Sequence, residues 1–137
     1  MNLLSSSVAF TPKNDGSERF VEKYSFEQRE TQSAKIRAQF PDRVLVILEP
    51  APRTTTALVS GNIKTKFLVP GEQTVGKFIA NFRSQLKLPQ EQGIYLFTLE
   101  NTLPAVSMTM SQLDSQHRSK DGFLYLVYSG ENTFGQK

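Results

Sequence analysis

Four short runs of apolar residues along the chain predict β-strands. Residues 44–48 (VLVIL) are apolar at every position and rich in β-branched side chains, which is typical of a strand covered on both faces. Residues 123–128 (FLYLVY) are six consecutive apolar or aromatic residues, too short to cross a membrane as a helix and typical of a buried strand. Residues 94–98 (IYLFT) are expected to form a further strand. Residues 63–69 mix lysines with apolar residues, so this strand has two different faces.

The strand expected at residues 63–69 has the features of a sheet edge. Alternation places Lys64, Lys66 and Leu68 on one face, opposite Phe67 and Val69. Lysines on a strand guard an edge against aggregation. An exposed edge is also where a peptide from a partner can add itself as a further strand. The pattern is compatible with a solvated, guarded edge and with a peptide-binding edge.

The clearest helix is expected at residues 75–86, with Thr74 as its N-cap. Apolar residues recur there at helical spacing and form one stripe that predicts packing on a sheet. Phe78 lies on the flank of the stripe, with Asn81 beyond it. We therefore expect Phe78 to be partly exposed and to line a cleft beside the edge strand.

Two helices are expected before the first strand, at residues 18–23 with Ser17 as cap and at residues 26–39. The second carries charges of alternating sign, which indicates an exposed helix, and it ends before Pro41. These helices are the obvious cover for the second face of residues 44–48. A short helical turn is also expected at residues 111–114, capped by Ser111.

The order of strand, strand, helix, strand and strand predicts an α+β protein with a ubiquitin-like β-grasp fold and two additional N-terminal helices. We expect a flexible tail at residues 1–16, a helical subdomain at 17–42, a β-grasp core at 43–128 and a flexible tail at 129–137.

Composition makes an enzyme the least favoured class. The chain of 137 residues contains no cysteine and a single histidine, His117, in a polar stretch. Disulfides and thiol catalysis are excluded, and a histidine-based zinc site or a Ser-His-Asp triad is improbable. We expect no cofactor and no metal. No signal peptide is expected and no run is long enough for a membrane span, so a membrane role would need docking or a covalent anchor.

The net charge of +3 is concentrated in the first half of the chain, where residues 1–66 carry ten basic and seven acidic residues. This excess suits acidic peptides or anionic lipid, or serves solubility alone. Nucleic acid is not the expected partner, because the basic residues are interleaved with acids and no glycine-rich phosphate loop is present.

Several short segments in a fixed order carry a resemblance that covers residues 25–135. They are SFEQR at 25–29, KIR at 35–37, FPDRV at 40–44, KFLVP at 66–70, TVGKF at 74–78, LP at 103–104, DGFLY at 121–125 and TFG at 133–135. Together they resemble the autophagy ubiquitin-like modifiers, the family of GABARAP and the microtubule-associated light-chain proteins.

The resemblance implies a modifier that is not itself an enzyme. It implies that a cysteine protease cleaves after Gly135 and removes Gln136 and Lys137. Ubiquitin-like activating and conjugating enzymes then carry the glycine carboxylate as thioesters to the amine of phosphatidylethanolamine. The protein would be cytoplasmic and become associated with the autophagosome membrane on lipidation. A glycine suits this chemistry because it has no Cβ and threads a narrow catalytic channel.

The resemblance also implies capture of receptors that carry an aromatic-x-x-aliphatic motif, often beside acids. The aromatic set, which would form the first pocket, is Gln32, Ile36, Leu45, Lys66, Leu68 and Phe123. The aliphatic set, which would form the second pocket, is Phe67, Val69, Pro70 and Phe78. The contacts to acidic peptide residues would be Arg43, Lys64 and Lys66.

Two alternatives stay open at this stage. Plain core packing is the alternative role for Ile36, Leu45 and Phe123. The protein could also be an adaptor that binds peptides through the same groove and is never lipidated. Gln73, Asn81 and Gln85 depart from the family pattern and predict a more polar second pocket. The loop at residues 50–61 and the extension before Ser25 are longer than in the family, and neither has an assigned role.

Overall fold

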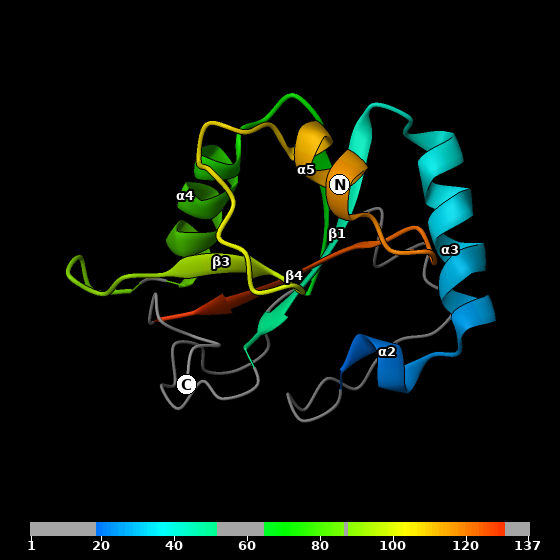
Figure 1. Ribbon diagram of the computed structural model, residues 1–137, viewed down its shortest axis with the longest axis horizontal. Coiled ribbons are helices and arrows are strands. Elements are labelled where there is room, and N and C mark those ends of the chain that lie inside the picture. The colour runs from blue at the N-terminus through cyan, green and yellow to red at the C-terminus, as the bar shows by residue number, and fades with distance from the viewer. Residues whose placement is uncertain (1–18, 52–64, 87, 131–137) are drawn as a thin grey trace.

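A four-stranded mixed sheet forms the centre of the computed structural model, which describes residues 19–51, 65–86 and 88–130. The strands are β1 (Arg43–Pro50), β2 (Lys66–Pro70), β3 (Tyr95–Thr98) and β4 (Leu124–Ser129), in the spatial order β2-β1-β4-β3. The central strands β1 and β4 run parallel, and each outer strand pairs antiparallel with its neighbour. This is the mixed sheet of a β-grasp fold, as the order of elements predicts (Figure 1).

Helix α4 (Val75–Leu86) packs on one face of the sheet, as its apolar stripe predicts. Its N-cap is Thr74, whose Oγ1 accepts the backbone N–H of Lys77 at 3.1 Å. The core on this face joins residues from the helix and from alternate positions of every strand. Its fully buried members include Val46, Val75, Leu96, Leu124 and Leu126.

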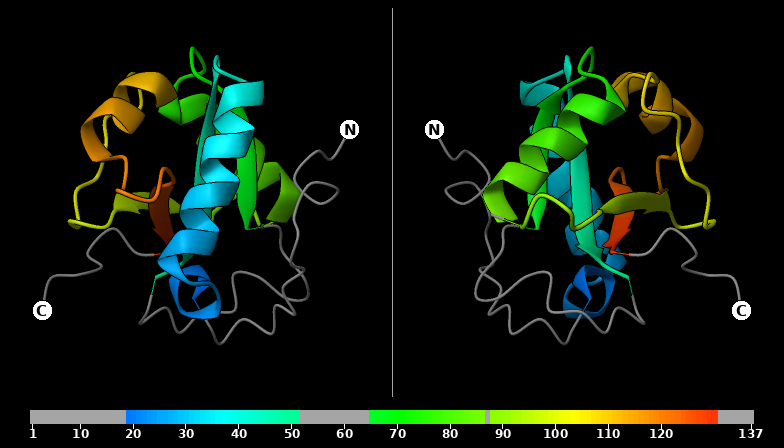
Figure 2. Two further views of the ribbon diagram at one scale, coloured as in Figure 1. Left: turned by 90° about the vertical axis from the view of Figure 1, so that its right-hand side faces the viewer. Right: turned by 90° about the vertical axis from the view of Figure 1, so that its left-hand side faces the viewer.

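The opposite face is covered by α2 (Phe20–Lys23) and α3 (Phe26–Gln39), so β1 is buried on both sides as expected (Figure 2). A second core lies between these helices and the sheet. It consists of Phe20, Tyr24, Ile36, Leu45, Ile47, Phe123 and Tyr125. Ser25 caps α3 with a capping box: the backbone N–H of Gln28 donates to Ser25 Oγ, and the backbone N–H of Ser25 donates to Gln28 Oε1.

Helix α3 is fastened to the turn that precedes β4. Asp121, buried in that turn, accepts hydrogen bonds from Arg29 Nε at 2.8 Å and from the Tyr125 hydroxyl at 2.6 Å. Burial, together with this bond to Asp121, raises the pKa of Tyr125. The Ser33 hydroxyl donates to the backbone carbonyl of Asp121. These contacts join the helical segment to the sheet by polar bonds as well as by apolar packing.

Helix α2 is anchored to the end of β1. The backbone N–H of Phe20 donates to Glu49 Oε2 at 2.8 Å, and Arg19 donates to the carbonyl of Pro50 at 2.5 Å. Burial raises the pKa of the Glu49 carboxyl. The helix is shorter than expected among the described residues, because Arg19 is its N-cap, and the predicted cap Ser17 lies outside them.

Helix α5 (Met110–His117) corrects a sequence-based expectation. The pattern predicted a turn at residues 111–114 capped by Ser111, but the cap is Thr109 and the helix continues to His117. The physical reason is a capping box, in which Thr109 Oγ1 accepts from Gln112 N at 3.1 Å and Gln112 Oε1 accepts from Thr109 N at 2.9 Å.

The remaining differences concern boundaries. Strand β2 begins at Lys66, and the expected residues 63 and 64 lie outside the described part of the chain. So do the predicted tail at residues 1–16 and most of the tail at 129–137. Within the described residues, no helix has both the length and the apolar character needed to cross a membrane.

Candidate functional site

Strand β2 lies at an outer edge of the sheet, as its lysines predict. It pairs with β1 on one side only, with Leu68 opposite Leu45 and Phe67 opposite Val46. The observed alternation also matches the predicted one. Lys66 and Leu68 are half-buried on the α3 side, whereas Phe67 and Val69 are buried on the α4 side. An edge strand of this kind can accept a peptide as an additional strand.

The aromatic set comes together in one place, from α3, β1, β2 and the residue before β4. Its three innermost members, Ile36, Leu45 and Phe123, are each 0% exposed. They are core residues in this structure and form the floor of the region, not an open pocket. Only Lys66 and Leu68 are half-buried, and Gln32 is 6% exposed between α3 and β2.

Lys66 lies at the outer side of this region, between Gln32 and Phe20. Its Nζ atom donates to Gln32 Oε1 at 3.0 Å and lies 5.4 Å from the centre of the Phe20 ring. That ring packs against Phe123, with 5.1 Å between the ring centres. Burial lowers the pKa of the Lys66 ammonium to about 8, because the charged form has lost part of its hydration.

Phe20 is a member of this region that the sequence analysis missed. The available signal was the spacing of Phe20 and Tyr24, two aromatic residues one helical turn apart, whose rings lie 5.1 Å apart. Only the fold brings this pair over Phe123 and Tyr125, because those residues are about a hundred positions further along the chain.

The aliphatic set also lies together, at the contact between β2 and α4. The rings of Phe67 and Phe78 meet edge to face at 5.5 Å, and Val69 is buried beside them in the same core. Pro70 is half-buried at the end of β2.

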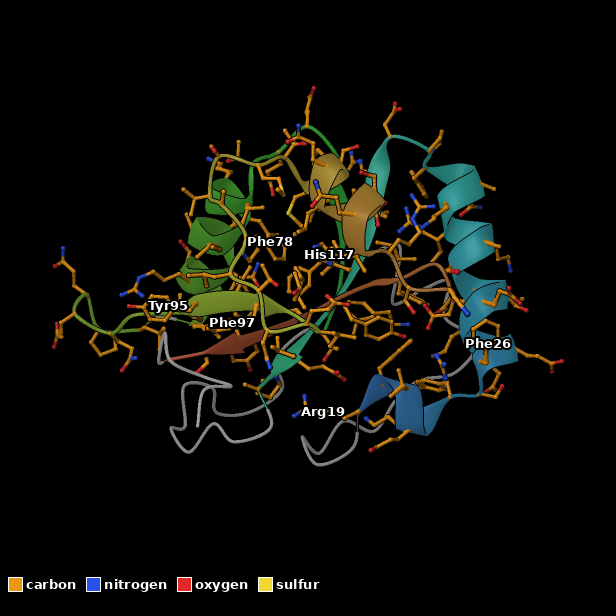
Figure 3. The ribbon with its side chains drawn as sticks, viewed as in Figure 1. Arg19, Phe26, Phe78, Tyr95, Phe97 and His117 are labelled. Atoms are coloured by element: carbon orange, nitrogen blue, oxygen red, sulfur yellow. The ribbon has the colours of Figure 1, made fainter. Side chains whose placement is uncertain are left out.

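The expectation that Phe78 is partly exposed is wrong, because its side chain is 2% exposed and points from α4 toward the sheet (Figure 3). A position on the flank of a helical stripe can be buried when a neighbouring strand supplies a ring at the same level, as Phe67 does here.

The three polar residues that depart from the family pattern differ in exposure. Asn81 and Gln85 are exposed on α4. Gln73 is half-buried in the turn after β2, and its Oε1 atom is buried without a hydrogen-bond partner within the described residues.

The expected contacts to acidic peptide residues are only partly visible. Arg43 is exposed at the start of β1, opposite Pro70 of β2. Lys64 lies outside the described residues, as do Gly135, Gln136 and Lys137. His117, which the sequence places in a polar stretch, pairs with Glu100, at 3.1 Å between Nδ1 and Oε1. The described residues contain no group of three or more histidine, aspartate or glutamate side chains that could hold a metal.

The sheet order, the parallel central pair and the helix α4 between β2 and β3 define a ubiquitin-like β-grasp protein. The family model described as "Autophagy protein Atg8 ubiquitin like" matches residues 28–135. The chain belongs to this Atg8 family.

Named relatives agree with this assignment. The chain is 43% identical over 117 residues to Autophagy-related protein 8 of Schizosaccharomyces pombe, which covers 85% of this chain and 93% of the relative. It is 44% identical over 117 residues to Autophagy-related protein 8 of Mycosarcoma maydis, and this match covers 85% of this chain and 96% of the relative. The crystal structure of Trypanosoma brucei ATG8 matches with a TM-score of 0.74 and 34% identity, over 87% of this chain and 99% of that one.

Proposed function

We propose that this Atg8-family protein is a ubiquitin-like modifier, not an enzyme, and that it is conjugated through Gly135 to phosphatidylethanolamine. The observation that carries the proposal is where the family match ends. It covers residues 28–135, so its last residue is Gly135, which Gln136 and Lys137 follow in the sequence. A modifier needs a C-terminal glycine carboxylate, and cleavage after Gly135 would create one.

The composition of the chain supports a division of labour with other proteins. Because the chain has no cysteine, it cannot form a thioester on its own side chains. A cysteine protease would release the glycine, and activating and conjugating enzymes would carry its carboxylate to the lipid amine. The product is an amide that holds the protein at the autophagosome membrane, whereas the unconjugated protein is cytoplasmic.

The second part of the proposed function is the capture of receptors with an aromatic-x-x-aliphatic motif. The position of β2 at the sheet edge supports it, since an incoming peptide can pair there with backbone groups. Leu68 and Lys66 offer an apolar contact and a cation on the side of the aromatic set. Because Ile36, Leu45 and Phe123 are fully buried, a receptor's aromatic side chain would enter by displacing Lys66 or Leu68.

Conjugation is tested by following the protein in autophagic cells after Gly135→Ala. The matched control is Gly130→Ala, the same substitution nearer the end of β4. We expect membrane puncta to be lost with Gly135→Ala and retained with Gly130→Ala. Puncta that persist in Gly135→Ala would instead favour the adaptor that binds peptides without being lipidated.

Receptor capture is tested by titrating an acidic aromatic-x-x-aliphatic peptide and measuring its dissociation constant. Phe123→Ala is a poor probe, because it would remove a buried ring from the core. Leu68→Asp places a charge on the edge strand, and the control Leu103→Asp changes a residue that is 52% exposed between β3 and α5. We expect only Leu68→Asp to weaken binding, by tenfold or more. Equal binding by both variants would reject this edge as the receptor site.

A further inference from the structure

A receptor peptide added along β2 would place the first and last residues of its motif on opposite faces of the sheet. The two are three positions apart, and side chains at that spacing in an extended strand point to opposite sides. If the aromatic residue meets Leu68 on the α3 side, the final residue therefore lies on the α4 side. That is the side of the aliphatic set.

Most of the aliphatic set is already enclosed in the core. Phe67, Val69 and Phe78 are all buried, and the rings of Phe67 and Phe78 meet edge to face at 5.5 Å. Separating these rings to admit a further side chain would break contacts in a close-packed interior. Of this set only Pro70 is half-buried, so the final residue of the motif would meet the end of β2.

Gln73 is the polar residue joined to this end of the strand. Its backbone N–H donates to the carbonyl of Pro70 at 3.1 Å, within the turn that follows β2. Its own carbonyl accepts the backbone N–H of Met110, which is fully buried at the start of α5, at 2.8 Å. Backbone bonds on both sides therefore hold residue 73 next to the end of β2.

The side chain of Gln73 carries an acceptor that lacks a donor. The Oε1 atom is buried and has no hydrogen-bond partner within the described residues, although the residue as a whole is only half-buried. A buried acceptor without a partner costs free energy, which a donor brought by a ligand would recover. The amide turns easily about its last side-chain torsion, so it can present this oxygen to a neighbouring group.

We propose that Gln73 makes the receptor site prefer a hydrogen-bond donor, such as an asparagine amide, at the final position of the receptor motif. The site also accepts an aliphatic residue there, but an aliphatic residue leaves Gln73 Oε1 without a donor. Only the donor recovers the cost of the unpaired acceptor, so it binds more tightly. This inference rests on the proposed function, because it assumes that receptor peptides bind along β2.

The test compares two receptor peptides that carry leucine or asparagine at the final motif position and are otherwise identical. Their dissociation constants are measured with the wild type, Gln73→Leu and Gln116→Leu. The last variant is the matched control, the same substitution at an exposed position of α5. We expect the wild type and the control to bind the asparagine peptide about fivefold more tightly, the range of one neutral hydrogen bond. We expect Gln73→Leu to prefer the leucine peptide, because the acceptor is gone.

A second measurement needs only the wild type and so does not depend on the folding of a variant. The side-chain carbonyl carbon of Gln73 is followed by NMR while each peptide is added. We expect its resonance to move downfield with the asparagine peptide, because its oxygen then accepts a hydrogen bond. With the leucine peptide we expect no downfield movement.

The outcomes separate this inference from the proposed function. A preference for the leucine peptide in the wild type, or the same ratio of dissociation constants in the wild type and Gln73→Leu, would overturn the inference and leave the receptor site intact. A Gln73 resonance that does not move when the asparagine peptide binds would also overturn it. Binding of neither peptide by any of the three proteins would overturn the receptor site, and the inference with it.

Discussion

Gly122 is the residue at which a single methyl group should disturb the contact between α3 and the sheet most severely. It has a φ of 96°, in the region that favours glycine. A Cβ added there would stand 2.9 Å from Ser33 Cβ on α3 and closer still to Ser33 Oγ. Ser33 cannot simply rotate away at no cost, because its hydroxyl donates to the backbone carbonyl of Asp121.

Gly122→Ala should lower the free energy of unfolding by about 2–5 kcal/mol. Backbone strain at positive φ accounts for about 1–2 kcal/mol of this, and overpacking against Ser33 for about 1–3 kcal/mol. Urea unfolding followed by circular dichroism measures the change. Gly76→Ala is the control within α4, where the new Cβ meets Val106 at 3.3 Å and the gain in helix propensity offsets that crowding.

A double-mutant cycle with Ser33→Gly separates the two contributions. Ser33→Gly removes both atoms that the new Cβ would strike, so Gly122→Ala in that background should cost only the backbone strain, about 1–2 kcal/mol. The reasoning would be refuted if Gly122→Ala cost the same in both backgrounds, or no more than Gly76→Ala.

Three further predictions concern other contacts. Thr109→Ala should cost about 1 kcal/mol in urea unfolding by removing the cap of α5, and a change below 0.3 kcal/mol would contradict the capping box. Arg29→Met should cost about 3–5 kcal/mol, because it leaves the buried Asp121 carboxylate without its ion-pair partner; unfolding at unchanged denaturant concentration would contradict this. Lys66 has a pKa of about 8 in the folded protein and its ordinary value of 10.5 in the unfolded chain. Between these pH values the unfolded chain holds more protons than the folded protein, so the free energy of unfolding should rise between about pH 8 and 10.5. Lys66→Met should lack this rise, and equal slopes in both proteins would argue against it.

The sequence was informative where one element could be interpreted by itself. The apolar stripe of α4, the lysines of β2 and the apolar β1 each reflect a local pattern, and their places in the fold follow from it. Thr109 and Gln112 form an equally local capping signal, which was present in the sequence and overlooked.

The burial of residues in the candidate site depends on contacts between segments that are distant in the sequence. Phe20, Lys66 and Phe123 come from three separate parts of the chain, and only the packed structure places them together. Likewise, no pattern within α4 reveals that the ring of Phe67 covers Phe78. The family resemblance grouped the residues of the aromatic set but did not include Phe20, and it did not decide between an open pocket and core packing for Ile36, Leu45 and Phe123.

The most direct test of the central claim is intact-mass spectrometry of the membrane-bound protein purified from its native cells. The account predicts a chain that ends at Gly135, lacks Gln136 and Lys137, and carries phosphatidylethanolamine on the glycine carboxylate. A membrane-bound protein found only with its intact Gln136-Lys137 terminus and without lipid would contradict it.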